Sequence, residues 1–213
     1  MSSPISPPST QSPGSRIGVF GGTFDPPHYG HLVIAQEAYA RLGLAKVLFV
    51  PAGQPPHKPG RAISPPEDRV AMVERAIAGN RAFELCRVDL DRPGPSYTAD
   101  MLALLQAQLG PAAELYLIVG MDSLADFASW HEPARIISLC RLVAVTRPGY
   151  AADPAALERV IPGCSERIIL LEAPRLDISA TELQRRVAAG LPIRYQVPES
   201  VRTYIRRRRL YAP

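Results

Sequence analysis

The sequence predicts an α/β fold of three layers, with an open, doubly wound parallel sheet between two layers of helices. Segments with strand character alternate with segments of helical periodicity from residue 16 onward, which is typical of parallel strands joined by right-handed crossovers. Each strand candidate is a continuous apolar run, as expected for strands covered by helices on both faces. A ligand site is therefore expected at the carboxyl ends of the strands, where the strand order reverses.

Three strands and three helices are predicted in the first half of the chain. RIGVF at 16–20 is a short apolar strand that ends in Gly-Gly, and a proline stops the β-branched and aromatic strand at Lys46–Ala52. Helical periodicity with a closing glycine predicts a helix over His31–Leu44. The same criteria predict a helix, a strand and a helix at 67–79, 83–90 and 96–110.

The second half continues the alternation. Apolar runs predict strands at Glu114–Gly120, at Arg141–Gly149 with a turn at its end, and at Arg167–Pro174. Helical segments are expected at 121–130, 132–140, Ser179–Ala189 and Pro198–Arg206.

Composition indicates a soluble protein with one domain. The chain has 213 residues, of which 46% are hydrophobic and 21% charged. We interpret the Ser/Pro-rich residues 1–15 as a disordered tail and residues 16–213 as a single domain, since the tail lacks the basic start and apolar middle of a secretory signal. No apolar run approaches the roughly 20 residues that span a bilayer, so we expect no membrane association.

Charge and cysteine content set further expectations. The net charge of +4 suits anionic ligands without establishing a nucleic-acid binder. Three cysteines far apart in the sequence suggest reduced thiols in a cytoplasmic protein. The Arg206–Arg209 run is interpreted as a solvated helix end, although such runs also bind phosphate backbones.

The stretch GGTFDPPHYGHL carries the strongest functional signal. Gly21 and Gly22 end the first predicted strand, where glycine lets the backbone approach a ligand, and a helix start follows. His28 and His31 lie three residues apart, so both side chains can face one side of the incoming turn. Two histidines at a helix N-terminus suit a transition state with charge on a phosphoryl group. A metal site is less well supported, because H-x-x-H alone supplies too few ligands.

This stretch resembles the first signature of the nucleotidylyltransferase superfamily, whose (T/H)-x-G-H core stands here as residues 28–31. In the G-G-[ST]-F-D-P-x-H-x-G-H form it resembles the bacterial nicotinate-nucleotide adenylyltransferases. Further motifs agree in the same order: PPHKP at 55–59, SYTADML at 96–102, GMDSLADFASW at 120–130, RPG at 147–149 and ISATELQRR at 178–186. The resemblance implies a Rossmann-like fold and an enzyme that joins ATP to nicotinate mononucleotide in NAD biosynthesis, giving deamido-NAD and pyrophosphate. Mg²⁺ is implied with ATP as co-substrate.

By this resemblance, His28 and His31 are the catalytic residues, which bind the ATP phosphates and stabilise the transition state. The implied ATP-binding residues are Gly21, Gly22, Thr23, Lys58, Ser179, Thr181 and Arg185. Lys58 resembles the loop lysine that reaches phosphate in the family, and a solvated loop lysine is the less favoured alternative. Asp25 is expected to brace the loop, since an acid facing phosphates would repel them.

The nicotinate mononucleotide site is implied by a second set of residues: Tyr97, Thr98, Asp122, Trp130 and His131. Trp130 would stack on the nicotinate ring, although a lone Trp is most often packed in a core. Thr98 would donate to the nicotinate carboxylate beside backbone amides near His131. Asp122 would bind a ribose hydroxyl or cap the following helix.

One position departs from the family pattern. The family motif I-S-[SA]-T-x-[IL]-R ends in an arginine. In this chain Gln184 stands at that position, and Arg185 and Arg186 follow it. Gln184 cannot replace a guanidinium charge, and Arg185 points about 100° away on an ideal helix. Either Arg185 reaches round to the phosphate, or phosphate binding is weaker at this position.

Other functions remain open from sequence alone. A sister enzyme with the same H-x-G-H core could act on phosphopantetheine or transfer a cytidylyl group, and a close relative could prefer nicotinamide mononucleotide. A non-catalytic nucleic-acid-binding protein would use the basic tail and show steep salt dependence. Both signature histidines are intact, so we expect an enzyme with no nucleic-acid partner; a homo-oligomer stays open.

Overall fold

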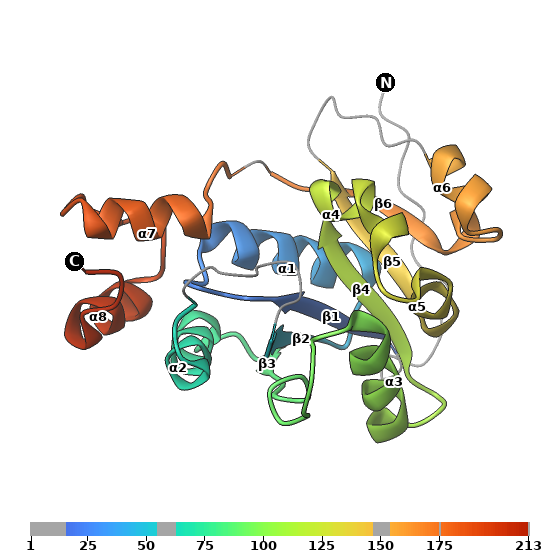
Figure 1. Cartoon of the computed structure of the whole chain (residues 1–213), viewed down its shortest axis with the longest axis horizontal. Coiled ribbons are helices and arrows are strands. Elements are labelled where there is room, and N and C mark those ends of the chain that lie inside the picture. Colours follow the sequence, from blue (N-terminus) through green and yellow to red (C-terminus); the bar gives the residue numbers. More distant parts are fainter. Residues whose placement is uncertain (1–15, 55–62, 147–153, 175, 213) are drawn as a thin grey trace.

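A six-stranded, wholly parallel sheet forms the centre of the computed structural model, which describes residues 16–54, 63–146, 154–174 and 176–212 (Figure 1). The strand order is β3-β2-β1-β4-β5-β6, so the direction of chain winding reverses between β1 and β4. Val19 of β1 pairs with Leu48 of β2 on one side and Leu117 of β4 on the other. The strands are β1 (Arg16–Gly22), β2 (Lys46–Pro51), β3 (Phe83–Leu85), β4 (Glu114–Gly120), β5 (Cys140–Thr146) and β6 (Ile168–Glu172). The predicted doubly wound α/β fold is confirmed.

Helices cover both faces of the sheet. The main helices are α1 (Tyr29–Leu42), α2 (Pro66–Ile77), α3 (Thr98–Leu109), α4 (Met121–Ala125), α5 (Pro133–Leu139), α6 (Pro154–Val160), α7 (Ala180–Ala188) and α8 (Glu199–Arg208). Side chains of α1 and α2 share one apolar cluster with one face of the strands, and those of α3 to α6 share another with the opposite face. Along β4, Leu115 and Leu117 enter the second cluster while Tyr116 and Ile118 enter the first. Burial on both faces explains the continuous apolar runs.

Several boundaries differ from the prediction. α1 begins at Tyr29 because His28 is its N-cap. β3 ends at Leu85, since the chain turns at Arg87–Asp91, where Leu90 N and Asp91 N donate to the Arg87 carbonyl. The segment 121–130 divides into α4 and the short 3₁₀ helix Phe127–Ser129, and α6 was not predicted.

The C-terminal helices have a core of their own, built on α2. Its buried members are Met72, Leu183, Ile193, Val197, Val201 and Ile205. Figure 1 shows α7 and α8 next to α2 at one end of the molecule, opposite α6. This segment therefore approaches the sheet from outside, near the loop that follows β1.

The described residues contain no helix long and apolar enough to cross a membrane. Cys140 and Cys164 are buried and Cys86 is partly exposed, and all three are unpaired thiols. The predicted tail at 1–15 lies outside the described residues.

Truncation of Leu183 tests the C-terminal core. Leu183 is 1% exposed, so Leu183→Ala should lower the free energy of unfolding by about 2–5 kcal/mol through lost burial and a cavity. Leu191 is 45% exposed and serves as the matched control, with an expected loss near 0.5 kcal/mol or less. Urea unfolding measures both variants; equal losses would contradict the assignment of Leu183 to a packed core.

Candidate active site

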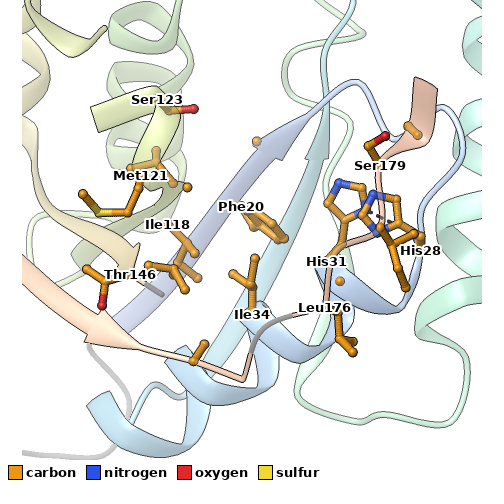
Figure 2. A pocket seen from close by; sticks show the side chains of 18 of the residues that line it. Phe20, His28, His31, Ile34, Ile118, Met121, Ser123, Thr146, Leu176 and Ser179 are labelled. Carbon is orange, nitrogen blue, oxygen red and sulfur yellow. Dashed lines mark hydrogen bonds between the residues drawn. The ribbon is translucent and has the colours of Figure 1, made fainter. Parts of the chain in front are cut away.

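A cavity of about 460 Å³ opens at the carboxyl ends of the strands, on the side where β1 and β4 diverge (Figure 2). Its walls come from the ends of β1 and β4, the start of α1, the end of β5, and the segment from β6 to the start of α7. His28 and His31 lie on one side and Ser123 and Thr146 on the other. The cavity has the size of a small-molecule site and the position expected for a doubly wound sheet.

The two histidines form a stacked pair at the N-terminus of α1. Their ring centroids are 3.7 Å apart with an interplanar angle of 29°. The backbone N–H of His28 donates to Nδ1 of His31 at 3.2 Å, so Nδ1 of the neutral His31 ring is unprotonated and Nε2 carries the hydrogen. The edge of Phe24 packs on His31 with centroids 5.1 Å apart. The geometry therefore fixes His31 as a donor through Nε2.

His28 is buried, and burial lowers its pKa to about 4. Its Nδ1 has no hydrogen-bond partner among the described residues. A buried polar atom without a partner is rare, and a ligand oxygen or a water would satisfy it. A Cβ on Gly30 would lie 3.0 Å from this nitrogen, so a side chain at position 30 would press on the His28 ring.

A buried arginine holds the loop that carries the histidines. Arg69 of α2 is 1% exposed, and its guanidinium donates to the carbonyls of Thr23 at 3.1 Å, Ala52 at 2.7 Å and Ser64 at 3.1 Å. Burial lowers the pKa of Arg69 below its ordinary value, and the charge of Asp25 acts in the opposite sense. These bonds join the ends of β1 and β2 to the start of α2.

Asp25 braces the same loop, as expected from sequence. Its side chain is buried, and Oδ2 accepts the backbone N–H of Ser64 at 3.0 Å. The backbone carbonyl of Asp25 accepts Nε2 of Gln184 at 2.7 Å. Gln184, the residue that departs from the family pattern, thus contacts the loop backbone.

The start of α7 reaches the cavity, whereas Arg185 does not. Ser179 caps α7 by accepting the N–H of Glu182 at 3.3 Å, and Ser179 and Thr181 both line the cavity. Arg185 forms two hydrogen bonds to Glu182, each 2.8 Å long, and its side chain is 67% exposed. The structure therefore directs Arg185 toward Glu182 on the helix surface, away from the predicted phosphate contact.

A second, smaller cavity of about 100 Å³ adjoins the first. Gly21, Ile118, Val119 and Trp130 line both cavities, so these residues mark the boundary between them. Gly22, Asp89, Ser96 and Thr98 line only the second cavity of the two. Thr98 is the first residue of α3, so the N-terminus of that helix lies at this cavity.

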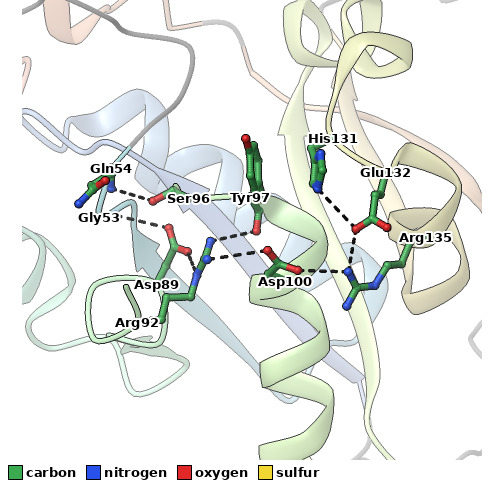
Figure 3. A network of polar contacts seen from close by, with 10 residues as sticks. All are labelled: Gly53, Gln54, Asp89, Arg92, Ser96, Tyr97, Asp100, His131, Glu132 and Arg135. Carbon is green, nitrogen blue, oxygen red and sulfur yellow. Dashed lines mark hydrogen bonds and ion pairs between the residues drawn. The ribbon is translucent and has the colours of Figure 1, made fainter. Parts of the chain in front are cut away.

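A network of polar contacts includes Asp89 and Ser96, two residues that line the second cavity (Figure 3). Arg92 pairs with the buried carboxylate of Asp89 at 2.7 Å and donates to the Tyr97 carbonyl at 3.2 Å. Arg135 joins Asp100 of α3, at 3.1 Å, to Glu132, at 2.7 Å. These contacts hold the start of α3 against the segment that precedes α5.

Tyr97 and His131 lie at the edge of this network. Their rings stack with centroids 4.0 Å apart, and Nε2 of His131 lies 3.6 Å from a Glu132 oxygen. The His131 side chain is 48% exposed. Neither side chain is among those that line the second cavity, but Tyr97 lies between Ser96 and Thr98, which do line it.

Three predicted residues need separate mention. Thr23 contributes its carbonyl to Arg69, and the residues described for the two cavities do not include it. Asp122 lies in α4, with its side chain outside the described part, and Lys58 lies outside the described residues altogether. Within the described ranges, no three His, Cys, Asp or Glu side chains gather in a way that could hold a metal ion.

Sequence reasoning missed the residues that support the site. Arg69, Asp89 and Arg92 were not predicted. The i,i+3 spacing of Asp89 and Arg92 was a usable local signal. Arg69 gave none, because its carbonyl partners lie up to 46 residues away.

Comparison with known proteins identifies the family of the chain and supports its fold. The sequence model of the cytidylyltransferase-like family matches residues 19–186. A protein named "probable nicotinate-nucleotide adenylyltransferase" from Roseiflexus sp. (strain RS-1) is 52% identical over 92% of this chain and 97% of its own, and one of the same name from Saccharopolyspora erythraea is 49% identical over 92% and 89%. The Plasmodium falciparum nicotinic acid mononucleotide adenylyltransferase complexed with NaAD has the same fold, with a TM-score of 0.75, 20% identity, and coverage of 92% of this chain and 97% of that one.

The burial of His28 makes a prediction about stability and pH. Its pKa is about 4 in the folded protein and about 6.5 in an unfolded chain, so the unfolded state binds the extra proton between these values. The neutral, buried His28 therefore makes its full contribution to the free energy of unfolding above about pH 6.5. This contribution is lost as the pH falls toward 4. From pH 7 to pH 4.5, the free energy of unfolding of the parent protein should fall by about 2 kcal/mol more than that of His28→Asn, as measured by urea unfolding. His131→Asn is the exposed control and should follow the parent; a parent-like loss in His28→Asn would contradict the burial argument.

Proposed function

The chain belongs to the cytidylyltransferase-like family. From its named relatives and from the geometry of the site, we propose that it transfers the adenylyl group of ATP to nicotinate mononucleotide, giving deamido-NAD and pyrophosphate. The observation that carries the proposal is the junction of the two cavities at Gly21 and Trp130. A donor nucleotide in one cavity and an acceptor in the other would meet at this junction. The reaction serves NAD biosynthesis.

The larger cavity suits ATP. The N-termini of α1 and α7 both face it, and helix N-termini attract phosphate. His31 donates through Nε2, while Ser179 and Thr181 add hydroxyls from the start of α7, where Ser179 lies beside the histidine pair (Figure 2). Gly21 leaves room for the ligand, since no atom lies within 4 Å of the position that a Cβ would take. Lys58 is proposed to reach the phosphates from its loop.

The smaller cavity suits the nicotinate ring. Trp130 offers a flat face at the boundary, and Thr98 places a hydroxyl and a helix N-terminus where a carboxylate would be favoured. Arg92 neutralises the buried Asp89 carboxylate, which would otherwise repel an anionic acceptor. Tyr97 and His131 are proposed to flank the ring, and Asp122 to meet a ribose hydroxyl.

The proposed chemistry is a single in-line displacement. An oxygen of the nicotinate mononucleotide phosphate attacks the α-phosphorus of ATP, and the bond from that phosphorus to the α–β bridging oxygen breaks. Its electrons leave with pyrophosphate, so negative charge grows on the leaving group. Positioned donors stabilise this charge, which is the role proposed for His28 and His31. We expect ATP to enter as its Mg²⁺ complex, with the ion held largely by phosphate oxygens and water.

Pyrophosphate release tests the proposal directly. With ATP and Mg²⁺ in excess, the chain should release pyrophosphate with nicotinate mononucleotide at least tenfold faster than with nicotinamide mononucleotide or phosphopantetheine, since roughly 1.4 kcal/mol of discrimination gives that ratio. Preference for either other acceptor would retain the ATP site and overturn the acceptor assignment. No release with any acceptor, joined to salt-dependent binding of nucleic acid, would favour a binding protein.

Paired variants separate the two cavities. His31→Asn keeps an acceptor for the His28 N–H but removes the Nε2 donor, so kcat should fall about 10²–10³-fold. Trp130→Ala should act mainly on KM for nicotinate mononucleotide, since stacking binds ground and transition states alike. Steady-state kinetics with each substrate varied in turn measure both; a change in KM alone for His31→Asn would contradict its transition-state role.

A further inference from the structure

The loop that carries the histidines shares three hydrogen bonds with the C-terminal segment 183–211. Gln184 Nε2 donates to the Asp25 carbonyl at 2.7 Å, and the N–H of Tyr29 donates to the Gln196 carbonyl at 3.0 Å. The Tyr211 hydroxyl donates to Oδ1 of Asp25 in a short contact. A segment with its own apolar core is thus joined to residues 25–29 at both the backbone and the side chain.

Tyr211 completes the environment of a buried carboxylate. Asp25 is 5% exposed. Its Oδ2 accepts a hydrogen bond from the Ser64 N–H, and its Oδ1 accepts one from the Tyr211 hydroxyl. Burial raises the pKa of Tyr211 above its ordinary value, and the charge of Asp25 raises it further, so the hydroxyl stays protonated and remains a donor. Loss of this donor would leave one oxygen of a buried carboxylate without its partner.

The backbone before Tyr211 is held in an unfavourable conformation. Arg209 and Tyr211 have φ values of 51° and 61°, in the left-handed region that side chains rarely adopt. Such conformations persist where surrounding contacts over-determine them. Here they turn the chain back from the end of α8 so that the Tyr211 ring reaches Asp25 and Met72.

We propose that Tyr211 is a positioning residue for adenylyl transfer, which through Asp25 holds the His28–His31 pair in its reactive geometry. The inference rests on the proposed function and extends it to a residue that lines neither cavity. Asp25 and His28 are separated only by two buried prolines, so a shift of the carboxylate moves the N-cap of α1. A displacement of about 1 Å in a catalytic group costs up to about 10²-fold in rate.

The same segment supplies a matched control. Tyr204 of α8 donates to the buried carboxylate of Asp68 at 2.7 Å, beside Arg208 at 3.0 Å. Asp68 is 4% exposed, nearly the same as Asp25. Tyr204→Phe and Tyr211→Phe therefore each remove one hydroxyl from a buried Asp, but only the second touches the histidine loop.

The experiment combines kinetics with histidine titration on the full chain. Tyr211→Phe should lower kcat for pyrophosphate release at least about tenfold, with KM for ATP changed less than about threefold, because misplaced groups act in the transition state. In NMR titrations of the imidazole signals, the pKa of His28 should rise by about half a unit or more toward its ordinary value as the loop admits water. Tyr204→Phe should leave both quantities near those of the parent.

Two outcomes would overturn the proposal. One is a Tyr211→Phe variant with parental kcat and parental His28 titration; the other is an equal loss of kcat in both variants, which would indicate a general loss of stability. If the parent chain itself releases no pyrophosphate, the proposed function fails, and the His28 titration alone still decides whether Tyr211 holds the loop.

Discussion

The buried guanidinium of Arg69 is the interaction on which the site depends. A buried charge is costly unless its hydrogen-bonding groups are satisfied, and Arg69 meets this condition with three backbone carbonyls and the nearby charge of Asp25. Those carbonyls belong to Thr23 in the loop after β1, to Ala52 just after β2, and to Ser64, two residues before α2. A single side chain therefore ties together three segments that the sheet alone would leave free.

The anchoring of these segments by Arg69 matters for the histidines, which must be held in a fixed orientation. The reversal of strand order opens a crevice between β1 and β4, but a crevice by itself does not orient a histidine. The stacked rings of His28 and His31 take their orientation from the N-cap hydrogen bond, from the close approach of Gly30 and from Phe24. Preorganised donors need no reorganisation when charge develops, which is the property that phosphoryl transfer demands.

Local patterns predicted most of the fold and the centre of the site. The strands were recognisable because burial on both faces produces continuous apolar runs, and the histidine pair because its spacing and the glycines lie within one short stretch. α6 was missed because Pro154, Pro162 and Gly163 bracket this short segment, and such residues are typical of loops. Arg185 was predicted to bind ATP, and in the structure it pairs at the helix surface with Glu182, three residues earlier. The contact between Tyr211 and Asp25 joins residues 186 positions apart, and no local pattern encodes such a pairing.

The central claim is that both substrates occupy adjoining cavities at once and react in one displacement. The most direct test is the stereochemical course at the α-phosphorus, followed by ³¹P NMR with ATP that carries a single sulfur of known configuration on that phosphorus. One in-line displacement inverts the configuration, and inversion is the result we predict. Retention would require two displacements through an enzyme-bound adenylyl group and would contradict the account.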